Sequence, residues 1–369
     1  MIDRKLLKNL DWMLWLTMLL ISLFAVVVIR SAGATAIPGN PAYYAKRQVL
    51  FVLVGNAMIA VSLLFDYRLL LKFTKPIYLV TLGLLLAVLV AGSTGGGAQR
   101  WINVFGFILQ PSEFAKVFII IVLAHYLEQQ GVANSLKDLI WVGALVGLPM
   151  VLILIQPDLG TSLVFIAIFL GMLFGAGIQI KYLLGIIGAG IAALPVMWMY
   201  VLEGYQKLRL LAFLNPEAPA YWDHGGYQVL QSLIAIGSGR LFGQGYLQGT
   251  QNTRNFLPEK RTDFIFSVIG EEFGFIGSLL LILAFLFMMQ RILAIALDAK
   301  DVFGRLVSVG VLVLLLFQIF VNIGMALGMM PVTGIPLPFV TAGGSSYLAF
   351  SIAMALVLNI GMRRQKILF

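Results

Sequence analysis

One stretch of the chain, residues 264–289, reads FIFSVIGEEFGFIGSLLLILAFLFMM and is long enough to cross a bilayer as a helix. It contains two adjacent carboxylates, Glu271 and Glu272, and it follows the polar segment 258–263, which reads PEKRTD. A charge at membrane depth costs about 2.5 to 3.5 kcal/mol on insertion scales, so such residues usually face a polar cavity and carry function. The stretch therefore predicts a membrane-spanning helix beside a polar site.

The composition of the whole chain also indicates a membrane protein. Of its residues, 60% are hydrophobic and only 11% are charged, whereas soluble domains carry about 25% charged residues. The chain has no Cys, which excludes disulfides and thiolate catalysis, and its two His, His125 and His224, argue against a His-ligated metal. The net charge of +9 suits anionic lipid and an anionic substrate headgroup, and we expect no nucleic-acid partner.

Apolar runs predict an all-α polytopic membrane protein with about ten transmembrane helices, folded as a single integral membrane domain over residues 1–369. The first run lacks the small-residue cleavage pattern of a signal peptide, so we interpret it as a retained span. The predicted spans lie near 12–29, 49–65, 77–91, 114–127, 139–155, 162–176, 182–201, 264–289, 306–325 and 346–361.

The distribution of Lys and Arg predicts the orientation of the bundle. In the short segments between spans, these residues concentrate on the side that holds the N-terminus. The opposite side has Arg30, Lys46, Arg47 and Arg100 in its short segments. Because cytoplasmic loops of membrane proteins are enriched in Lys and Arg, we expect both termini to be cytoplasmic and the number of spans to be even.

Residues 202–263 are expected to form a large extracytoplasmic loop between the seventh and eighth spans. Connections longer than about 15 residues are usually functional or disordered. Segments 208–214 and 227–236 have helix-like apolar spacing, which predicts short helices lying at the membrane interface. The Gly-rich tract 237–249 could bring backbone amides close to a phosphate, but it lacks the Lys-Ser/Thr ending of a nucleotide P-loop.

Two more polar segments lie at the ends of apolar runs on this outer side. Residues 110–116 read QPSEFAK, and residues 156–162 read QPDLGTS. Like segment 258–264, each places a carboxylate where a bilayer should not tolerate one. The three segments are therefore the best candidates for a functional site.

Motifs in the second half of the chain resemble those of a known family. They read IGSGR at 236–240, GTQ at 249–251, NFLPE at 255–259, TDFIF at 262–266, GEE at 270–272, PVTGIPLPF at 331–339 and GGSS at 343–346. With segment 156–162, they resemble the SEDS family, the bacterial shape, elongation, division and sporulation proteins. The resemblance runs from about residue 30 to the C-terminus. Within the family, GTQ and the NIGM at 322–325 look more like the rod-shape members than the division members.

The resemblance implies a peptidoglycan glycosyltransferase of the bacterial cytoplasmic (inner) membrane. Such an enzyme polymerises lipid II into glycan strands, here during cell elongation. Lipid II is a disaccharide-pentapeptide on undecaprenyl pyrophosphate, and the growing glycan is linked to the same lipid. The resemblance also implies a class B penicillin-binding protein, a transpeptidase that cross-links the strands, as the partner.

Glycosyl transfer from a lipid pyrophosphate needs a base for the acceptor hydroxyl and positive charge for the leaving group. Asp263 ends a polar loop and begins an apolar span, where the pKa of a carboxyl is raised, so we expect it to be the general base. The alternative is that Asp263 only caps a helix. The candidate pyrophosphate ligands, which could equally be ordinary surface charge, are Lys207, Arg209, Arg254 and Arg261. A divalent cation, Mg²⁺ or Mn²⁺, is another way to stabilise the leaving charge, and its ligands stay unassigned.

The other candidate substrate contacts each have a structural interpretation as well. Asp158 could only cap the span that begins near 159. Glu113 and Lys116, three residues apart, could pair with each other on one helix face. Arg100 and Trp101 could be an anchor at the headgroup level. The serine candidates are Ser112 as a helix N-cap, and Ser345 and Ser346 as substrate contacts.

Three functions fit these features: a lipid-linked glycan polymerase, a flippase for lipid II, and a scaffold that only recruits a transpeptidase. Broken helices and a polar cavity suit a transporter as well as an enzyme. A flippase, however, should need polar residues in both halves of the bilayer. The inner half of the predicted spans is nearly free of them, so the carboxylates on the outer side favour the polymerase.

Overall fold

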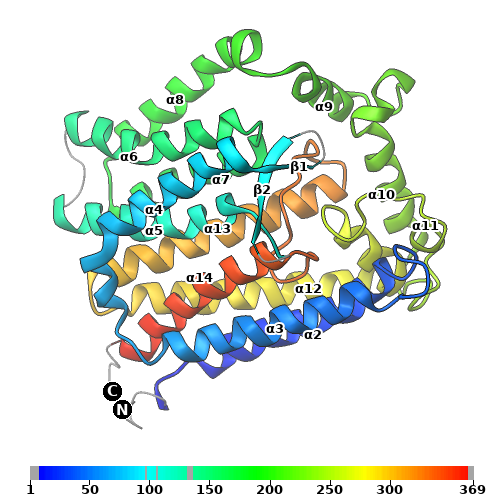
Figure 1. Ribbon diagram of the computed structural model, residues 1–369, viewed down its shortest axis with the longest axis horizontal. Coiled ribbons are helices and arrows are strands. Elements are labelled where there is room, and N and C mark those ends of the chain that lie inside the picture. Colours follow the sequence, from blue (N-terminus) through cyan, green and yellow to red (C-terminus); the bar gives the residue numbers. More distant parts are fainter. Residues whose placement is uncertain (1–7, 96–97, 105–106, 131–135, 365–369) are drawn as a thin grey trace.

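The computed structural model describes residues 8–95, 98–104, 107–130 and 136–364, which form a bundle of long helices (Figure 1). One helix, α8, lies at the edge of the bundle and has none of its side chains buried. The long helices are α2 (Trp12–Ala32), α3 (Tyr43–Ser62), α4 (Leu70–Ala91), α5 (Pro111–Gln130), α6 (Leu136–Ile155), α7 (Leu159–Ala176), α8 (Ile180–Val196), α12 (Ile265–Leu297), α13 (Val302–Ala326) and α14 (Gly344–Arg363).

These helices confirm the prediction of an all-α polytopic membrane protein with about ten spans. Among the described residues, nine helices are long and apolar enough to cross a membrane. The tenth helix, α5, has 20 residues but carries Glu113, Lys116 and Glu128. It therefore has more charged residues than a lipid-facing span of this length tolerates. It is nevertheless packed against α4, α6, α7, α13 and α14, which shield it from lipid.

Ion pairs join the start of α2 to α12 and to the end of α14 at one end of the bundle. The carboxylate of Asp11 lies 2.6 Å from Nη2 of Arg291 and 4.0 Å from Nη1 of Arg364. The two ends of the described chain therefore lie on the same side of the bundle, as an even number of spans requires (Figure 1). That this side is cytoplasmic stays a prediction.

A small antiparallel sheet between α4 and α5 was not expected from the sequence. Its strands are β1 (Ser93–Gly95), β2 (Ala98–Val104) and β3 (Phe107–Leu109), in the order β1-β2-β3. Two of the strands have only three residues, and the strand period of two cannot be recognised over so short a run. The sheet lies at the same end of the bundle as the long loop (Figure 1).

The segment between α8 and α12 contains short helices, as its apolar spacing suggested. The sequence-predicted stretches fall inside α9 and α10, while the placement of these helices at a membrane interface stays a prediction. The segment comprises a π-helical turn (Met197–Val201), α9 (Gly204–Leu214), a 3₁₀ helix (Pro219–His224), α10 (Gly226–Ser238) and α11 (Thr250–Thr253).

Helix α12 is broken at Gly274, where φ is 66° and ψ is −164°. The Gly-rich tract inserts at the break and forms backbone hydrogen bonds there. The amides of Phe275 and Ile276 donate to the carbonyls of Arg240 and Leu241 at 2.8 and 3.1 Å. Further along the tract, two amides donate in the other direction, to the carbonyls of α12 just before the break. The break therefore leaves these backbone groups paired, which a membrane helix requires.

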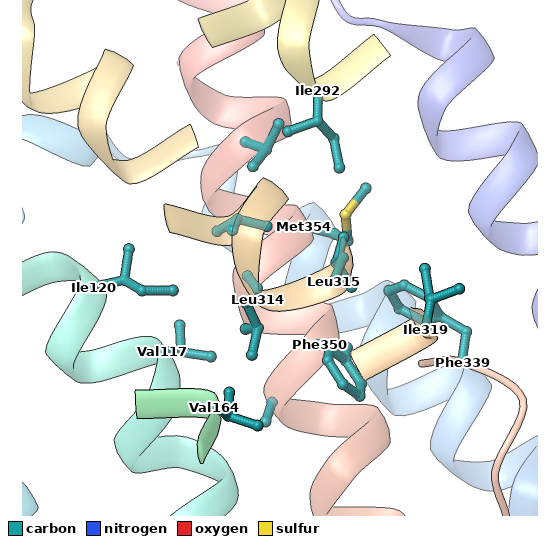
Figure 2. Packing of buried hydrophobic residues seen from close by; sticks show 14 of the residues in the cluster. Val117, Ile120, Val164, Ile292, Leu314, Leu315, Ile319, Phe339, Phe350 and Met354 are labelled. Atoms are coloured by element: carbon teal, nitrogen blue, oxygen red, sulfur yellow. The ribbon is translucent and has the colours of Figure 1, made fainter. Parts of the chain in front are cut away.

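Below the loop end, the centre of the bundle is mostly apolar, although Gln318 and Ser308 of α13 are also buried there. Figure 2 shows Val117 and Ile120 of α5 packed against Leu314 of α13 and Val164 of α7. Phe350 and Met354 of α14, with Ile292 of α12, continue this packing. The polar segments are thus confined to one end of a well-packed core.

The inserted tract generates a stability prediction. Gly243 has φ of 83°, and a Cβ on it would overlap the carbonyl of Glu272. We expect Gly243→Ala to lower the free energy of unfolding by at least about 2 kcal/mol, because the cost of the steric overlap adds to the cost of a positive φ for alanine. Gly237→Ala is the matched control, since a Cβ there meets nothing within 4 Å. Melting temperatures of the purified variants measure both, and equal values would contradict this account of the insertion.

Candidate active site

Asp263 lies at the end of the long loop, just before α12, at the centre of the polar end. The N-cap of α12 is Phe264 and no side chain caps the helix, so the helix-cap interpretation of Asp263 is wrong. The carbonyl of Asp263 accepts a hydrogen bond from Nδ2 of Asn322 at 3.0 Å. The same Nδ2 donates to the carbonyl of Ile335 at 2.8 Å. Asn322 of α13 thus ties Asp263 to segment 331–343.

The surroundings of Asp263 favour its protonated form more than water does. Burial raises the pKa of Asp263 to about 6, and the nearby carboxylate of Glu259 adds to the rise. The positive charges of Arg209 and Arg100 oppose it. The side chain is nevertheless partly accessible to solvent, and a Cβ on Gly334 would lie 3.6 Å from its Oδ2. The carboxylate is therefore poised to exchange a proton near neutral pH.

Two arginines from distant parts of the chain lie near enough to Asp263 for their charges to lower its pKa. Arg209 of α9 donates from Nη1 to the carbonyl of Val332 at 3.4 Å. Arg100 of β2 donates from Nε to the carbonyl of Gln156 at 3.2 Å and from Nη2 to the carbonyl of Pro157. The loop, the sheet and the α6–α7 turn thus bring positive charge to one place.

Asp158 is the N-cap of α7, as its structural interpretation held. Its Oδ1 accepts from the amide of Thr161 at 3.2 Å and its Oδ2 accepts from the hydroxyl of Thr161 at 2.9 Å. Nη1 of Arg100 lies 3.9 Å from Oδ1 of Asp158, and Nε2 of Gln110 lies 3.4 Å from Oδ2. Asp158 therefore stabilises the α6–α7 turn whose carbonyls accept hydrogen bonds from Arg100. A direct contact between Asp158 and the substrate stays a prediction.

Glu113 and Lys116 form a buried ion pair in the first turns of α5. Nζ of Lys116 lies 2.8 Å from Oε1 of Glu113, and the two side chains are 2% and 4% exposed. Oε2 of Glu113 has no hydrogen-bond partner, and neither has Oγ of Ser112. Because α5 begins at Pro111, Ser112 lies inside the helix and the prediction that it is an N-cap was wrong. The two charges neutralise each other, and one buried carboxylate oxygen stays without a hydrogen-bond partner.

The remaining candidates lie in three different places. The hydroxyl of Ser345 accepts from the amide of Gln110 at 3.0 Å and donates to the carbonyl of Ile108 at 3.2 Å, so it joins α14 to the end of β3. Ser346 follows it in the first turn of α14. Trp101 is on β2 next to Arg100, and Lys207 is half-buried on α9, two residues before Arg209. Their roles toward substrate stay predictions.

Lys260 is a residue of this region that the sequence analysis did not single out. Its Nζ donates to Oδ1 of Asn255 at 2.8 Å, to Oγ1 of Thr35 at 3.2 Å and to the carbonyl of Asn252. Burial, with the charge of Arg261, lowers the pKa of Lys260 to about 8. Lys260 fastens the loop before Asp263 to the α2–α3 connection. The only signal in the sequence was its place in a polar run before an apolar span.

Comparison with known proteins identifies the family. A family model described as a cell cycle protein, and named for FtsW, RodA and SpoVE, matches residues 9–366. The chain belongs to this family. It contains the SEDS proteins, so the resemblance read from the motifs is confirmed.

Relatives from both branches of the SEDS family are similar to the chain. A probable peptidoglycan glycosyltransferase FtsW of Trichlorobacter lovleyi is 39% identical over 95% of this chain and 92% of its own length. The peptidoglycan glycosyltransferase MrdB of Escherichia coli is 34% identical over 97% and 95%. The motifs suggested the rod-shape branch, but these sequence identities do not decide between it and the division branch.

Solved structures of SEDS proteins share the fold. A chain of a peptidoglycan synthase complex, solved to show how polymerisation and cross-linking are coordinated, has a TM-score of 0.81 and 29% identity over 95% of this chain and 97% of its own. The Thermus thermophilus rod-shape-determining protein RodA has a TM-score of 0.71 and 29% identity, over 97% and 98%. The helical bundle is thus the SEDS fold.

The buried pair on α5 gives a test that separates pairing from substrate binding. Either single change, Glu113→Gln or Lys116→Met, should lower the free energy of unfolding by about 3–5 kcal/mol, because it leaves one charge buried and unpaired. The double variant should recover most of that stability. We expect the double variant to stay inactive, because it lacks the Lys116 ammonium that would bind the pyrophosphate of the substrate. Melting temperatures and polymerisation rates of the three variants measure this, and an active double variant would reduce the pair to a structural role.

Proposed function

We propose that this SEDS protein is a peptidoglycan glycosyltransferase that polymerises lipid II, with Asp263 as its general base. The observation that carries the proposal is the setting of Asp263, a partly accessible carboxyl whose pKa is raised to about 6 beside two arginines. A base with a pKa near the working pH combines the ionised form with a useful affinity for the proton. The names of the FtsW and MrdB relatives support the same activity.

In the proposed reaction, Asp263 accepts the proton of the acceptor's hydroxyl. The hydroxyl oxygen attacks the sugar carbon that carries the pyrophosphate, and the bond from that carbon to the pyrophosphate oxygen breaks. The undecaprenyl pyrophosphate leaves with its negative charge. Arg209 and Arg100, which already act on the carboxylate of Asp263, are placed to stabilise this charge.

The proposal extends to the partner and to the cellular role. Similarity to a chain of a peptidoglycan synthase complex supports a complex with a transpeptidase, which we propose to be a class B penicillin-binding protein. Resemblance to RodA supports a role in cell elongation. Depleting the protein should then give round cells; filaments that fail to divide would indicate the division role.

Asp263→Asn tests the assignment of the base. The substitution removes the proton acceptor and should lower polymerisation of lipid II at least about 100-fold, the lower end for general-base catalysis. In the unmodified protein, kcat/KM should rise as pH increases through about 6, where Asp263 loses its proton, and then level off. The residual activity of the variant should lack this rise.

Folding of the Asn variant is checked by its melting temperature. Because the folded state raises the pKa of Asp263 above its ordinary value, ionising this group costs stability as pH rises toward 6. The variant should therefore be at least as stable as the parent at pH 7. Asp223→Asn, in the same long loop at an exposed position, is the matched control and should keep full activity. A near-normal rate for Asp263→Asn would remove Asp263 from the mechanism.

The expected divalent cation is also a proposal. The described residues contain no group of three His, Cys, Asp or Glu side chains that could hold a metal, so these residues do not fit an all-protein metal cage. Mg²⁺ commonly binds through substrate phosphates and few protein ligands. We expect EDTA to lower polymerisation and Mg²⁺ or Mn²⁺ to restore it, through a cation that arrives on the pyrophosphate. Full activity in thoroughly chelated samples would show that no such cation is used.

A further inference from the structure

Arginines and aromatic rings gather at the start of α3, near the loop that carries Asp263. The guanidinium of Arg261 lies over the ring of Tyr44, 4.2 Å from its centre. The guanidinium of Arg47 lies 5.7 Å from the ring centre of Tyr43 and 5.9 Å from that of Phe51. The rings of Tyr43 and Tyr44 meet edge to face at 5.1 Å. We call Arg261, Arg47, Tyr43, Tyr44 and Phe51 the α3 cluster.

The α3 cluster has positive charge without a counter-charge. Within the described part of the chain, neither Arg261 nor Arg47 forms an ion pair with a carboxylate. Nη1 of Arg261 is buried and has no hydrogen-bond partner. A buried donor left without an acceptor is costly, and a charged donor more so. An anionic ligand would supply the missing acceptor.

The cluster is held rigidly, as a binding site must be. The carbonyl of Arg261 accepts from the amide of Ala342 at 3.0 Å, and the carbonyl of Thr262 accepts from the hydroxyl of Thr341 at 3.1 Å. The ring of Tyr44 also packs against Gly33, where a Cβ would lie 3.2 Å from the ring. Ring and guanidinium are therefore placed before any ligand arrives.

Segment 331–343 relates the α3 cluster to Asp263. One part of it, at Val332, accepts from Arg209, and the middle, at Gly334, borders the carboxylate of Asp263. The far part, at Ala342, is bonded to Arg261. Helix α9, which carries Arg209, and helix α3, which carries every member of the cluster except Arg261, lie on opposite sides of the molecule (Figure 1). Along this segment, Asp263 therefore lies between the contact with Arg209 and the contact with Arg261.

Two sets of cations, with one base between their contacts along this segment, match the chemistry of joining two pyrophosphate lipids. The donor loses its pyrophosphate at the reacting carbon, so the cations for that group must lie next to the base. In a linear polymer of disaccharide units, the acceptor reacts through a hydroxyl of its far sugar and keeps its own pyrophosphate. That second pyrophosphate lies a disaccharide away from the base. Arg209 and Arg100 suit the first position and the α3 cluster suits the second.

We propose that the α3 cluster binds the pyrophosphate of the acceptor lipid. This inference rests on the proposed glycosyltransferase function and adds a second anionic subsite to it. The planar guanidinium of Arg261 provides paired N–H groups for phosphate oxygens while its face stays on Tyr44. The headgroup of an anionic phospholipid shares this chemistry, so the experiment must distinguish the two sources.

Steady-state polymerisation of lipid II by Arg261→Gln is the first test. Losing a charge-assisted contact to the acceptor should raise KM for lipid II about tenfold or more, with a smaller change in kcat. Lys46→Gln is the matched control, because Lys46 is an exposed cation on the next residue to Arg47 and lies outside the cluster. Arg261→Lys keeps the charge but not the planar fork and should recover part of the loss. Melting temperatures establish that each variant is folded.

Binding measured without catalysis separates this inference from the proposed function. Native mass spectrometry of the protein in phosphatidylcholine nanodiscs should count two bound molecules of undecaprenyl pyrophosphate, and one for Arg261→Gln. The count should not respond to added phosphatidylglycerol. An unchanged KM and count for Arg261→Gln, an equal loss for Lys46→Gln, or displacement by phosphatidylglycerol would each overturn the acceptor site. If the parent binds two molecules but never polymerises lipid II, the proposed function fails and the second anionic site stands.

Discussion

The backbone hydrogen bonds across the break in α12 determine where the polar end of the molecule lies. Gly274 interrupts the helix, and in a bilayer each backbone group left unpaired costs several kcal/mol. The Gly-rich tract supplies the partners for Phe275 and Ile276. The carboxylates before the break then hold the next part of the loop. Oε1 of Glu271 accepts from the amide of Gln251 at 2.6 Å and Oε2 accepts from the amide of Asn252 at 3.1 Å. The loop that ends in Asp263 is thus fixed from α12 itself.

Sequence patterns predicted the helices well because the bilayer imposes one length and one composition on each span. The motif at 262–266 also placed Asp263 at a polar–apolar boundary, where the structure has it. Patterns failed where distant segments meet. Nothing local to Asn322 says that its amide joins Asp263 to Ile335, and nothing near Arg261 says that it stacks on Tyr44. Such contacts depend on which helices become neighbours, which one sequence does not state.

Helix α5 shows why composition alone misjudges a functional span. Its charges disqualify it as a lipid-facing helix, yet five other helices surround it. An ion pair at low dielectric is tolerable only when the partners are close and shielded from lipid, and Glu113 and Lys116 meet both conditions at 2.8 Å. This charged span is therefore one of the interior ones, whereas the strongly apolar α8 has no buried side chain. The position of α5 inside the bundle is consistent with the need to shield the Glu113–Lys116 pair from lipid.

The same arrangement bears on whether the protein moves its lipid or joins it to another. Transport would need polar groups along the whole depth of the bundle. Beneath the Glu113–Lys116 pair, the buried side chains of α5 run through Val117, Ile120 and Leu123, all apolar. They pack against equally apolar residues of α7, α13 and α14 (Figure 2). A headgroup with a pyrophosphate and two sugars would lose its hydration there without gaining partners. In this conformation the described core closes the site from the end that holds the two termini, as suits an enzyme more than a transporter.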